Sequence, residues 1–117
     1  MTQQYEAVIG VEIHLRLNTA SKMFIGNTNG ESDEANIYTD PVTLGHPGTL
    51  PMVNEEAVRL ATLMALALNS DVATHTTFAR KHYFYPDLPK GYQVTQGDLP
   101  IATGGYLDVY LPDDPEP

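Results

Sequence analysis

The stretch that decides the fold runs Ala79-Arg-Lys-His-Tyr-Phe-Tyr-Pro-Asp-Leu-Pro-Lys-Gly-Tyr-Gln-Val-Thr-Gln96. It holds Arg80, Lys81 and Lys90, half of the 6 Lys and Arg residues in a chain that carries 15 Asp and Glu residues. Its two prolines fix the backbone locally, and its aromatic side chains are large and rigid. A cationic, aromatic loop stiffened by proline and glycine, in an otherwise acidic or apolar chain, indicates where an anionic ligand would bind.

The same stretch predicts a pair of strands joined by a turn. Residues 72–85 are rich in Thr and aromatic residues and read as extended, Pro86 ends that strand, and residues 92–96 return as a short strand after a turn at 90–91. Alternation then puts Arg80 and His82 on one face, and Lys81 with the following tyrosines on the other. Arg grips phosphate through two parallel hydrogen bonds, and Lys supplies a point charge. The alternative is a rigid turn with core tyrosines and surface cations, and composition alone favours neither interpretation.

Towards the N-terminus, residues 5–17 alternate apolar and polar side chains, which predicts a long strand with one buried face. Its polar face carries Glu12 and His14, which lie two apart and therefore roughly 7 Å apart along the strand. A carboxylate beside an imidazole can ligate a divalent cation or act as acid and base. A solvated face with an incidental Glu–His contact is the other interpretation, and the pattern alone favours it.

Between these strands the chain predicts a long irregular connection and one helix. Residues 18–51 are rich in Asn, Thr, Asp, Gly and Pro. Asn54 is a good N-cap, and the apolar residues that follow it up to Asn69 predict a helix that is largely buried. Residues 106–111 alternate as a last strand, and 112–117 predict a disordered tail. This order predicts an α+β fold with a mainly antiparallel sheet and a buried helix, within one domain.

Composition narrows the classes of function. The formal charge of −9 argues against a free-standing nucleic-acid binder. No apolar run approaches the length of a membrane span, and the first residues do not read as a signal peptide. With no cysteine, disulfides and thiolate metal sites are excluded, and the chain reads as cytoplasmic.

Three long segments of the chain resemble a known family. Residues 5–24, 40–54 and, most strongly, 80–96 closely resemble the GatB subunit of the bacterial aspartyl/glutamyl-tRNA amidotransferase. The resemblance implies a ligase of translation, in which GatB uses ATP and Mg²⁺ to phosphorylate the side-chain carboxylate of Glu-tRNA(Gln), and often of Asp-tRNA(Asn). Ammonia from the amidase subunit (GatA) then displaces the phosphate, and a small third subunit (GatC) holds the complex together. The implied fold is the glutamine synthetase and guanido kinase-like cradle domain.

The resemblance also implies roles for particular residues. Glu12 and His14 become candidate catalytic residues and Mg²⁺ ligands. Lys81 becomes a third candidate catalytic residue. The candidates for contacts to the nucleotide phosphates are Arg80, Lys81, Lys90 and Gln93, while Gln96 could hydrogen-bond the substrate or a neighbouring loop.

The chain departs from the family pattern in two ways. Many members carry four zinc-binding cysteines where this chain has Ile25, Asn27, Asp40 and Thr43, so no zinc is expected. The family subunit is also several times longer, so residues 1–111 are expected to be the N-terminal part of the catalytic domain, inactive alone. The helical domain and the tRNA-binding tail domain would then lie outside this chain. The alternative functions are a non-catalytic module that docks on the amidase, and a small anion- or metal-binding protein unrelated to tRNA.

Overall fold

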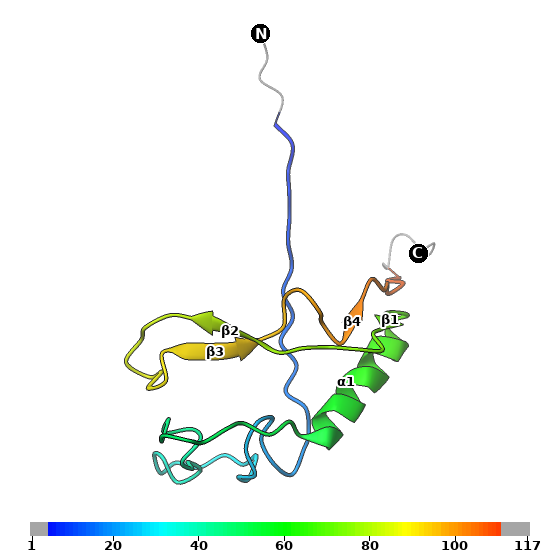
Figure 1. Ribbon diagram of the computed structural model, residues 1–117. Coiled ribbons are helices and arrows are strands. Elements are labelled where there is room, and N and C mark those ends of the chain that lie inside the picture. The colour runs from blue at the N-terminus through cyan, green and yellow to red at the C-terminus, as the bar shows by residue number, and fades with distance from the viewer. Residues whose placement is uncertain (1–4, 111–117) are drawn as a thin grey trace.

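The computed structural model describes residues 5–110, which contain one helix and four short strands (Figure 1). In chain order these are α1 (Glu55–Ala67), β1 (Asp71–Val72), β2 (Ala79–His82), β3 (Tyr92–Thr95) and β4 (Ala102–Thr103). The strands form two separate antiparallel pairs, β1 with β4 and β2 with β3. The predicted tail at 112–117 lies outside the described residues.

The helix forms where the sequence predicts it. The Asn54 side chain accepts a hydrogen bond from the Ala57 backbone N–H, and two glutamates occupy the first turn, where the helix dipole favours negative charge. The helix ends before Asn69, which adopts a φ of 54°. None of the described helices is long enough to cross a bilayer, since α1 has 13 residues.

The prediction that this helix is largely buried is wrong for the described residues. Of its side chains only Ala57 and Ala65 are buried, and Leu66 is 58% exposed. Among the described elements only the two-residue strand β1 packs extensively against α1. So short a strand cannot cover a helix that is apolar around most of its circumference.

The predicted pair of strands is confirmed, although both strands are shorter than predicted. Strand β2 stops at His82, before Pro86, and β3 covers Tyr92–Thr95. Their register places Lys81 opposite Gln93 and His82 opposite Tyr92. Because directly opposed residues share a face, Lys81 and Gln93 lie on one face of the hairpin, and His82 and Tyr92 lie on the other.

The strand predicted at 5–17 is not formed. The first part of this segment extends away from the rest of the chain (Figure 1), and Ile9 and Ile13 are 84% and 88% exposed. Its end contacts the long connection through side chains, where Arg16 pairs with Glu31 and the Asn29 amide donates to the Leu17 carbonyl. An alternating segment becomes a strand only when a neighbour takes up its backbone hydrogen bonds, and no segment within 5–110 does so. The last predicted strand is not formed either, because residues 106–110 pair with no strand among the described residues. The Tyr106 N–H donates instead to the Leu68 carbonyl just after the helix, at 2.9 Å, and Leu111 lies outside the described residues.

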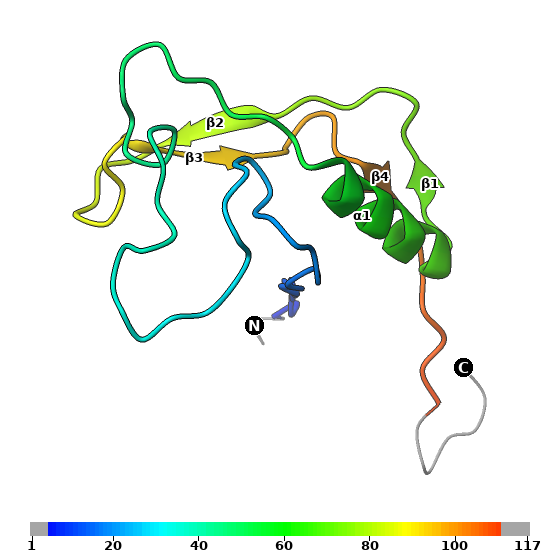
Figure 2. The same cartoon turned by 90° about the horizontal axis from the view of Figure 1, so that it is seen from below.

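The long connection at 18–51 is irregular, as predicted, and it is held at its two ends. The backbone N–H groups of Met52 and Asn54 donate to the carbonyl groups of Phe24 and Met23, at 3.0 and 2.9 Å. The Phe24 ring meets the Phe78 ring edge to face, with centroids 5.2 Å apart. These contacts place the connection beside the β2–β3 hairpin (Figure 2).

The described chain does not enclose a compact core. Its radius of gyration is 19.1 Å, whereas a compact domain of this length would have about 13 Å. The α+β cradle fold therefore stays a prediction, for which one helix and short antiparallel strands are the parts that the described residues contain.

Candidate functional site

The cationic stretch folds into a hairpin whose end is made of two consecutive turns. The Leu88 N–H donates to the Tyr85 carbonyl at 3.0 Å, and the Gly91 N–H donates to the Leu88 carbonyl at 2.9 Å. Each turn has proline at its second position, where the fixed φ of proline suits the turn. Gly91 has a φ of 67°, which favours glycine. The shape of the loop is therefore fixed by its own turns.

Two of the predicted phosphate-binding residues lie against the aromatic ring of Tyr92. The guanidinium carbon of Arg80 lies 4.3 Å from the centroid of the Tyr92 ring, and the Nζ atom of Lys90 lies 5.2 Å from it. The His82 ring lies 6.0 Å from the same ring. Cations at these distances are attracted to the face of the aromatic ring, so Tyr92 holds both charges at one end of the hairpin.

The cations of the hairpin differ from Arg16 and Arg59 in having no acidic partner within the described chain. Arg16 pairs with Glu31 and Arg59 pairs with Glu56, each at 2.7 Å. The three hairpin cations, Arg80, Lys81 and Lys90, form no ion pair within residues 5–110. A positive charge without a bound carboxylate remains available to an anionic ligand.

A cleft of about 330 Å³ opens between the end of the hairpin and residues 42–51. Lys90 and Tyr92 line one side of it, and His46 and Thr49 line the other. A second cleft, of about 320 Å³, lies between residues 22–25 and 87–93, and Lys90 and Tyr92 line it as well. Lys90 and Tyr92 therefore separate two hollows, of which the first brings together a lysine and a histidine.

The turn that carries His46 is fixed by its own hydrogen bonds. The Asp40 carboxylate accepts a hydrogen bond from the Thr43 backbone N–H at 2.7 Å, and this bond holds the pKa of Asp40 below its ordinary value of 3.8. The His46 N–H donates to the Pro41 carbonyl, and the Thr49 hydroxyl donates to the His46 carbonyl at 2.7 Å. Both backbone groups of His46 are thus satisfied.

Lys81, Gln93 and Gln96 take different positions from Arg80. Lys81 faces Gln93 across the hairpin, on the side away from Tyr92, whereas Arg80 lies against the Tyr92 ring; neither of the two cations lines either cleft. Gln93 lines the second cleft. The Gln96 amide donates to the Thr76 hydroxyl at 2.7 Å, so Gln96 bonds a neighbouring segment, one of the two roles predicted for it.

Glu12 and His14 stand apart from the hairpin. Their side chains are 92% and 93% exposed, with the carboxylate Oε2 and the imidazole Nε2 4.0 Å apart. They line neither of the two clefts, and among the described residues no third His, Asp or Glu joins them in a possible metal cluster. The predicted juxtaposition of these two residues with the three cations is not present in residues 5–110.

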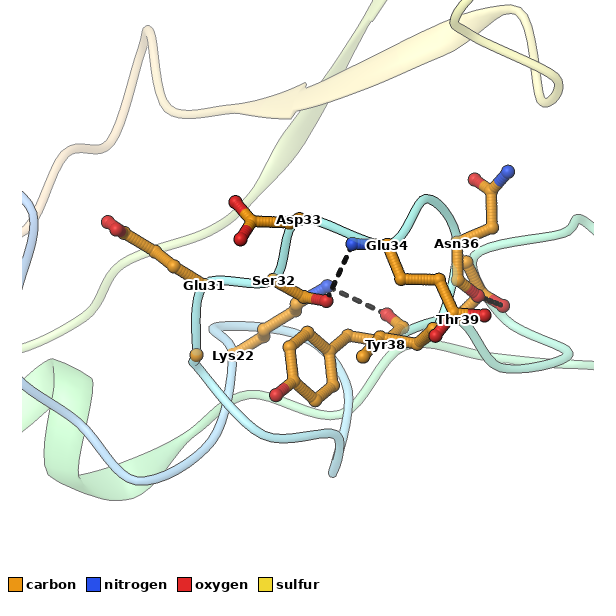
Figure 3. Close-up of a pocket in the computed structure, with 10 residues that line it drawn as sticks. Lys22, Glu31, Ser32, Asp33, Glu34, Asn36, Tyr38 and Thr39 are labelled. Carbon is orange, nitrogen blue, oxygen red and sulfur yellow. Dashed lines mark hydrogen bonds between the residues drawn. The ribbon is translucent and has the colours of Figure 1, made fainter.

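A further cleft, of about 560 Å³, lies inside the long connection, with Lys22 and an acidic run along its walls (Figure 3). The Nζ atom of Lys22 donates to the Tyr38 carbonyl at 2.8 Å. Glu31 and Glu34 point in opposite directions, so these carboxylates do not converge as metal ligands would (Figure 3). The cleft is a polar hollow in the connection, and we assign it no ligand.

Comparison with known proteins identifies relatives over nearly the whole chain. The profile of the family described as "GatB/GatE catalytic domain" matches residues 7–116. The chain is 52% identical over 110 residues to the GatB subunit of the aspartyl/glutamyl-tRNA(Asn/Gln) amidotransferase of Pseudomonas fluorescens strain SBW25. It is also 52% identical to the subunit of the same name from Pseudomonas syringae pv. syringae strain B728a. Each match covers 94% of this chain and 23% of the relative, so the chain spans about a quarter of those proteins.

Proposed function

The chain belongs to the GatB/GatE catalytic-domain family, and from that premise we propose that it forms part of a tRNA-dependent amidotransferase, in the portion that activates the substrate carboxylate. The proposed reaction transfers phosphate from ATP to the side-chain carboxylate of Glu-tRNA(Gln), or of Asp-tRNA(Asn). Ammonia from the amidase GatA then replaces that phosphate to give the amide. GatA, the small GatC protein and the mischarged tRNA are the proposed partners, and the cytoplasm is the proposed location.

One observation carries the phosphate-binding part of this proposal. The stretch that holds three cations without acidic partners in the described chain forms a stiff hairpin, and it lies within the family match. Phosphoryl transfer depends mainly on positioning and on neutralising charge. Arg80 and Lys90, held at one aromatic ring, are suited to neutralise the charge of a phosphate chain.

The described residues fit the phosphates better than they fit Mg²⁺. Mg²⁺ prefers six oxygen ligands and keeps several waters, and the pair at the N-terminal segment offers one carboxylate, from Glu12, and one imidazole, from His14. That pair is not a Mg²⁺ site by itself, and we derive no step through the metal. In the proposal Glu12 and His14 act as acid–base groups or as part of a larger ligand set. Lys81 is retained as a candidate catalytic residue on the other face of the hairpin.

The test uses the complete amidotransferase that contains this sequence. Glu12→Gln and His14→Asn are introduced separately, and the assembled complex is quantified before ATP-dependent amidation of Glu-tRNA(Gln) is measured. We expect each variant to assemble normally and to lose amidation by a factor of about 100 or more, the scale of general acid–base catalysis. Amidation within about twofold of the unmodified enzyme would remove both residues from the mechanism.

A second candidate function is docking without chemistry, and the exposed apolar residues of the N-terminal segment favour it. Val8, Ile9, Val11 and Ile13 are each at least 79% exposed, which is typical of a surface that a partner covers. The same experiment separates the two functions. Lost assembly with unchanged turnover for each complex that does assemble would favour docking over catalysis.

A further inference from the structure

We propose that His46 and Tyr92 are parts of one phosphate-binding subsite with Arg80 and Lys90, and that Lys81 lies outside it. The ligand is a di- or triphosphate chain. The proposal deepens the function proposed above, on which it rests only for the identity of that chain as the phosphates of ATP.

The subsite is built from two segments far apart in the sequence. The cleft of about 330 Å³ has Lys90 and Tyr92 on the hairpin side and His46 and Thr49 on the side of the long connection. The two segments lie side by side in Figure 2. A group bound between them would therefore meet an ammonium from one segment and an imidazole from the other.

Tyr92 fixes the spacing of the charges. Arg80 does not line the cleft itself and adjoins it through the Tyr92 ring. Because Arg80 and Lys90 both lie against that ring, they cannot be farther apart than their distances of 4.3 and 5.2 Å to the ring centroid taken together. A di- or triphosphate chain carries several negative oxygens over a length of this order. The ring acts on the ligand through the two cations, so Tyr92 is a positioning residue.

The His46 imidazole is available to form hydrogen bonds with the ligand. Both backbone groups of His46 are hydrogen-bonded within its own turn, and its side chain makes no hydrogen bond or ion pair to any of residues 5–110. An imidazole N–H is a hydrogen-bond donor, and phosphate oxygens are strong acceptors.

Gly45 allows the two segments to approach. Its φ is 72°, and a Cβ atom placed on it would lie 2.9 Å from the Cγ atom of Lys90. The stem of Lys90 thus packs directly over the backbone beside His46. This contact brings the lysine and the histidine to the same cleft.

Lys81 is separated from this group by the pairing of the strands. Its opposite residue is Gln93, whereas Tyr92 is opposite His82, so Lys81 lies on the other face of the hairpin. The sequence alone does not distinguish Lys81 from Arg80 and Lys90 as a phosphate-binding residue, whereas the register of the two strands separates it from them.

The test is calorimetric titration of the complete amidotransferase that contains this sequence with tripolyphosphate, at about 0.15 M salt to screen non-specific attraction. We expect the dissociation constant to rise about tenfold for Lys90→Ala and about threefold for His46→Ala. Tyr92→Leu should raise it about fivefold while Tyr92→Phe changes it less than about twofold, because phenylalanine keeps the ring face. Arg59→Gln is the control for net charge, since Arg59 is paired with Glu56.

Two results would overturn the proposal, and each variant is first shown to assemble into the complex to the same extent as the unmodified protein. One is the absence of tripolyphosphate binding at millimolar concentration. The other is a loss for Lys81→Ala as large as that for Lys90→Ala while His46→Ala has no effect, which would indicate diffuse attraction by the whole hairpin.

A parallel titration with ATP separates the subsite from the proposed function. Binding of tripolyphosphate that depends on His46 and Tyr92, with ATP bound no more tightly, supports the subsite and weakens the assignment of ATP. The opposite outcome is also informative. If ATP-dependent amidation by the complete enzyme is lost in Glu12→Gln but unchanged in His46→Ala and Tyr92→Leu, the proposed function is supported and the subsite is overturned.

Discussion

Replacing Asn54 tests whether one side chain both begins the helix and anchors the long connection. The side-chain carbonyl oxygen of Asn54 accepts a hydrogen bond from the Ala57 backbone N–H at 3.2 Å. Its amide nitrogen donates to the carbonyl oxygen and to the hydroxyl of Ser21, at 3.0 and 2.9 Å. Both ends of the amide are therefore in use, one on α1 and one on the start of the long connection.

The expected magnitudes follow from these contacts. Asn54→Ala removes the helix cap, which costs about 1 kcal/mol of stability. It also removes the hydrogen bonds to Ser21, which costs about 1 kcal/mol net. Asn54→Asp keeps an oxygen for Ala57 and gains about 0.5 kcal/mol from the helix dipole. It loses the donor and turns a carboxylate towards the Ser21 carbonyl, so we expect a net cost of about 1 kcal/mol.

Native-state hydrogen exchange of the α1 amides, in the complete amidotransferase that contains this sequence, measures these costs residue by residue. A loss of about 2 kcal/mol corresponds to exchange roughly 30-fold faster for Asn54→Ala, and about 1 kcal/mol to roughly fivefold faster for Asn54→Asp. Asn18→Ala, at an exposed asparagine without a hydrogen bond in the described chain, is the control. If Asn54→Asp exchanges like the unmodified chain, Ser21 contributes nothing. If it exchanges like Asn54→Ala, the cap contributes nothing.

Two more predictions concern the turn at the phosphate cleft. Gly45→Ala should weaken tripolyphosphate binding in calorimetry, because the new Cβ atom displaces Lys90. Gly48→Ala is the control: its φ is 79° but nothing lies within 4 Å of the new Cβ atom, so it should add only backbone strain and leave binding unchanged. Equal binding by both variants would contradict the contact between Gly45 and Lys90. The Asp40–Thr43 hydrogen bond lowers the folded pKa of Asp40, so its contribution to stability is complete above the unfolded value of 3.8 and is lost as pH falls below 3.8 through the folded value. The chemical shift of the Thr43 amide should follow that titration, and in Asp40→Asn it should stay constant over this range.

The sequence predicts those parts of the fold that depend on near neighbours. Asn54 followed by two glutamates marks the helix start, because capping is decided within one turn. The prolines and Gly91 mark the hairpin end, and alternation correctly divides Arg80 from Lys81. Residues 5–17 show the limit, since alternation predicts an apolar face but does not identify the segment that pairs with it.

The candidate site shows the same division between local and distant information. The three cations of the hairpin are evident from composition, and so is the stiffness of the loop between them. His46 is not evident, because its nearness to Lys90 depends on a positive φ at Gly45 and on the docking of two segments more than forty residues apart. The prediction that Glu12 and His14 face the cations also needs long-range contacts, and the described residues do not make them.

The scarcity of buried side chains has a calorimetric consequence. Unfolding raises the heat capacity in proportion to the apolar surface newly exposed to water, and of the described apolar side chains only Ala57 and Ala65 are buried. The chain on its own should therefore melt gradually, with a small heat-capacity step and no sharp endotherm. A cooperative thermogram would arise only when other polypeptide covers residues 5–17 and α1, so scanning calorimetry could report when that cover is in place.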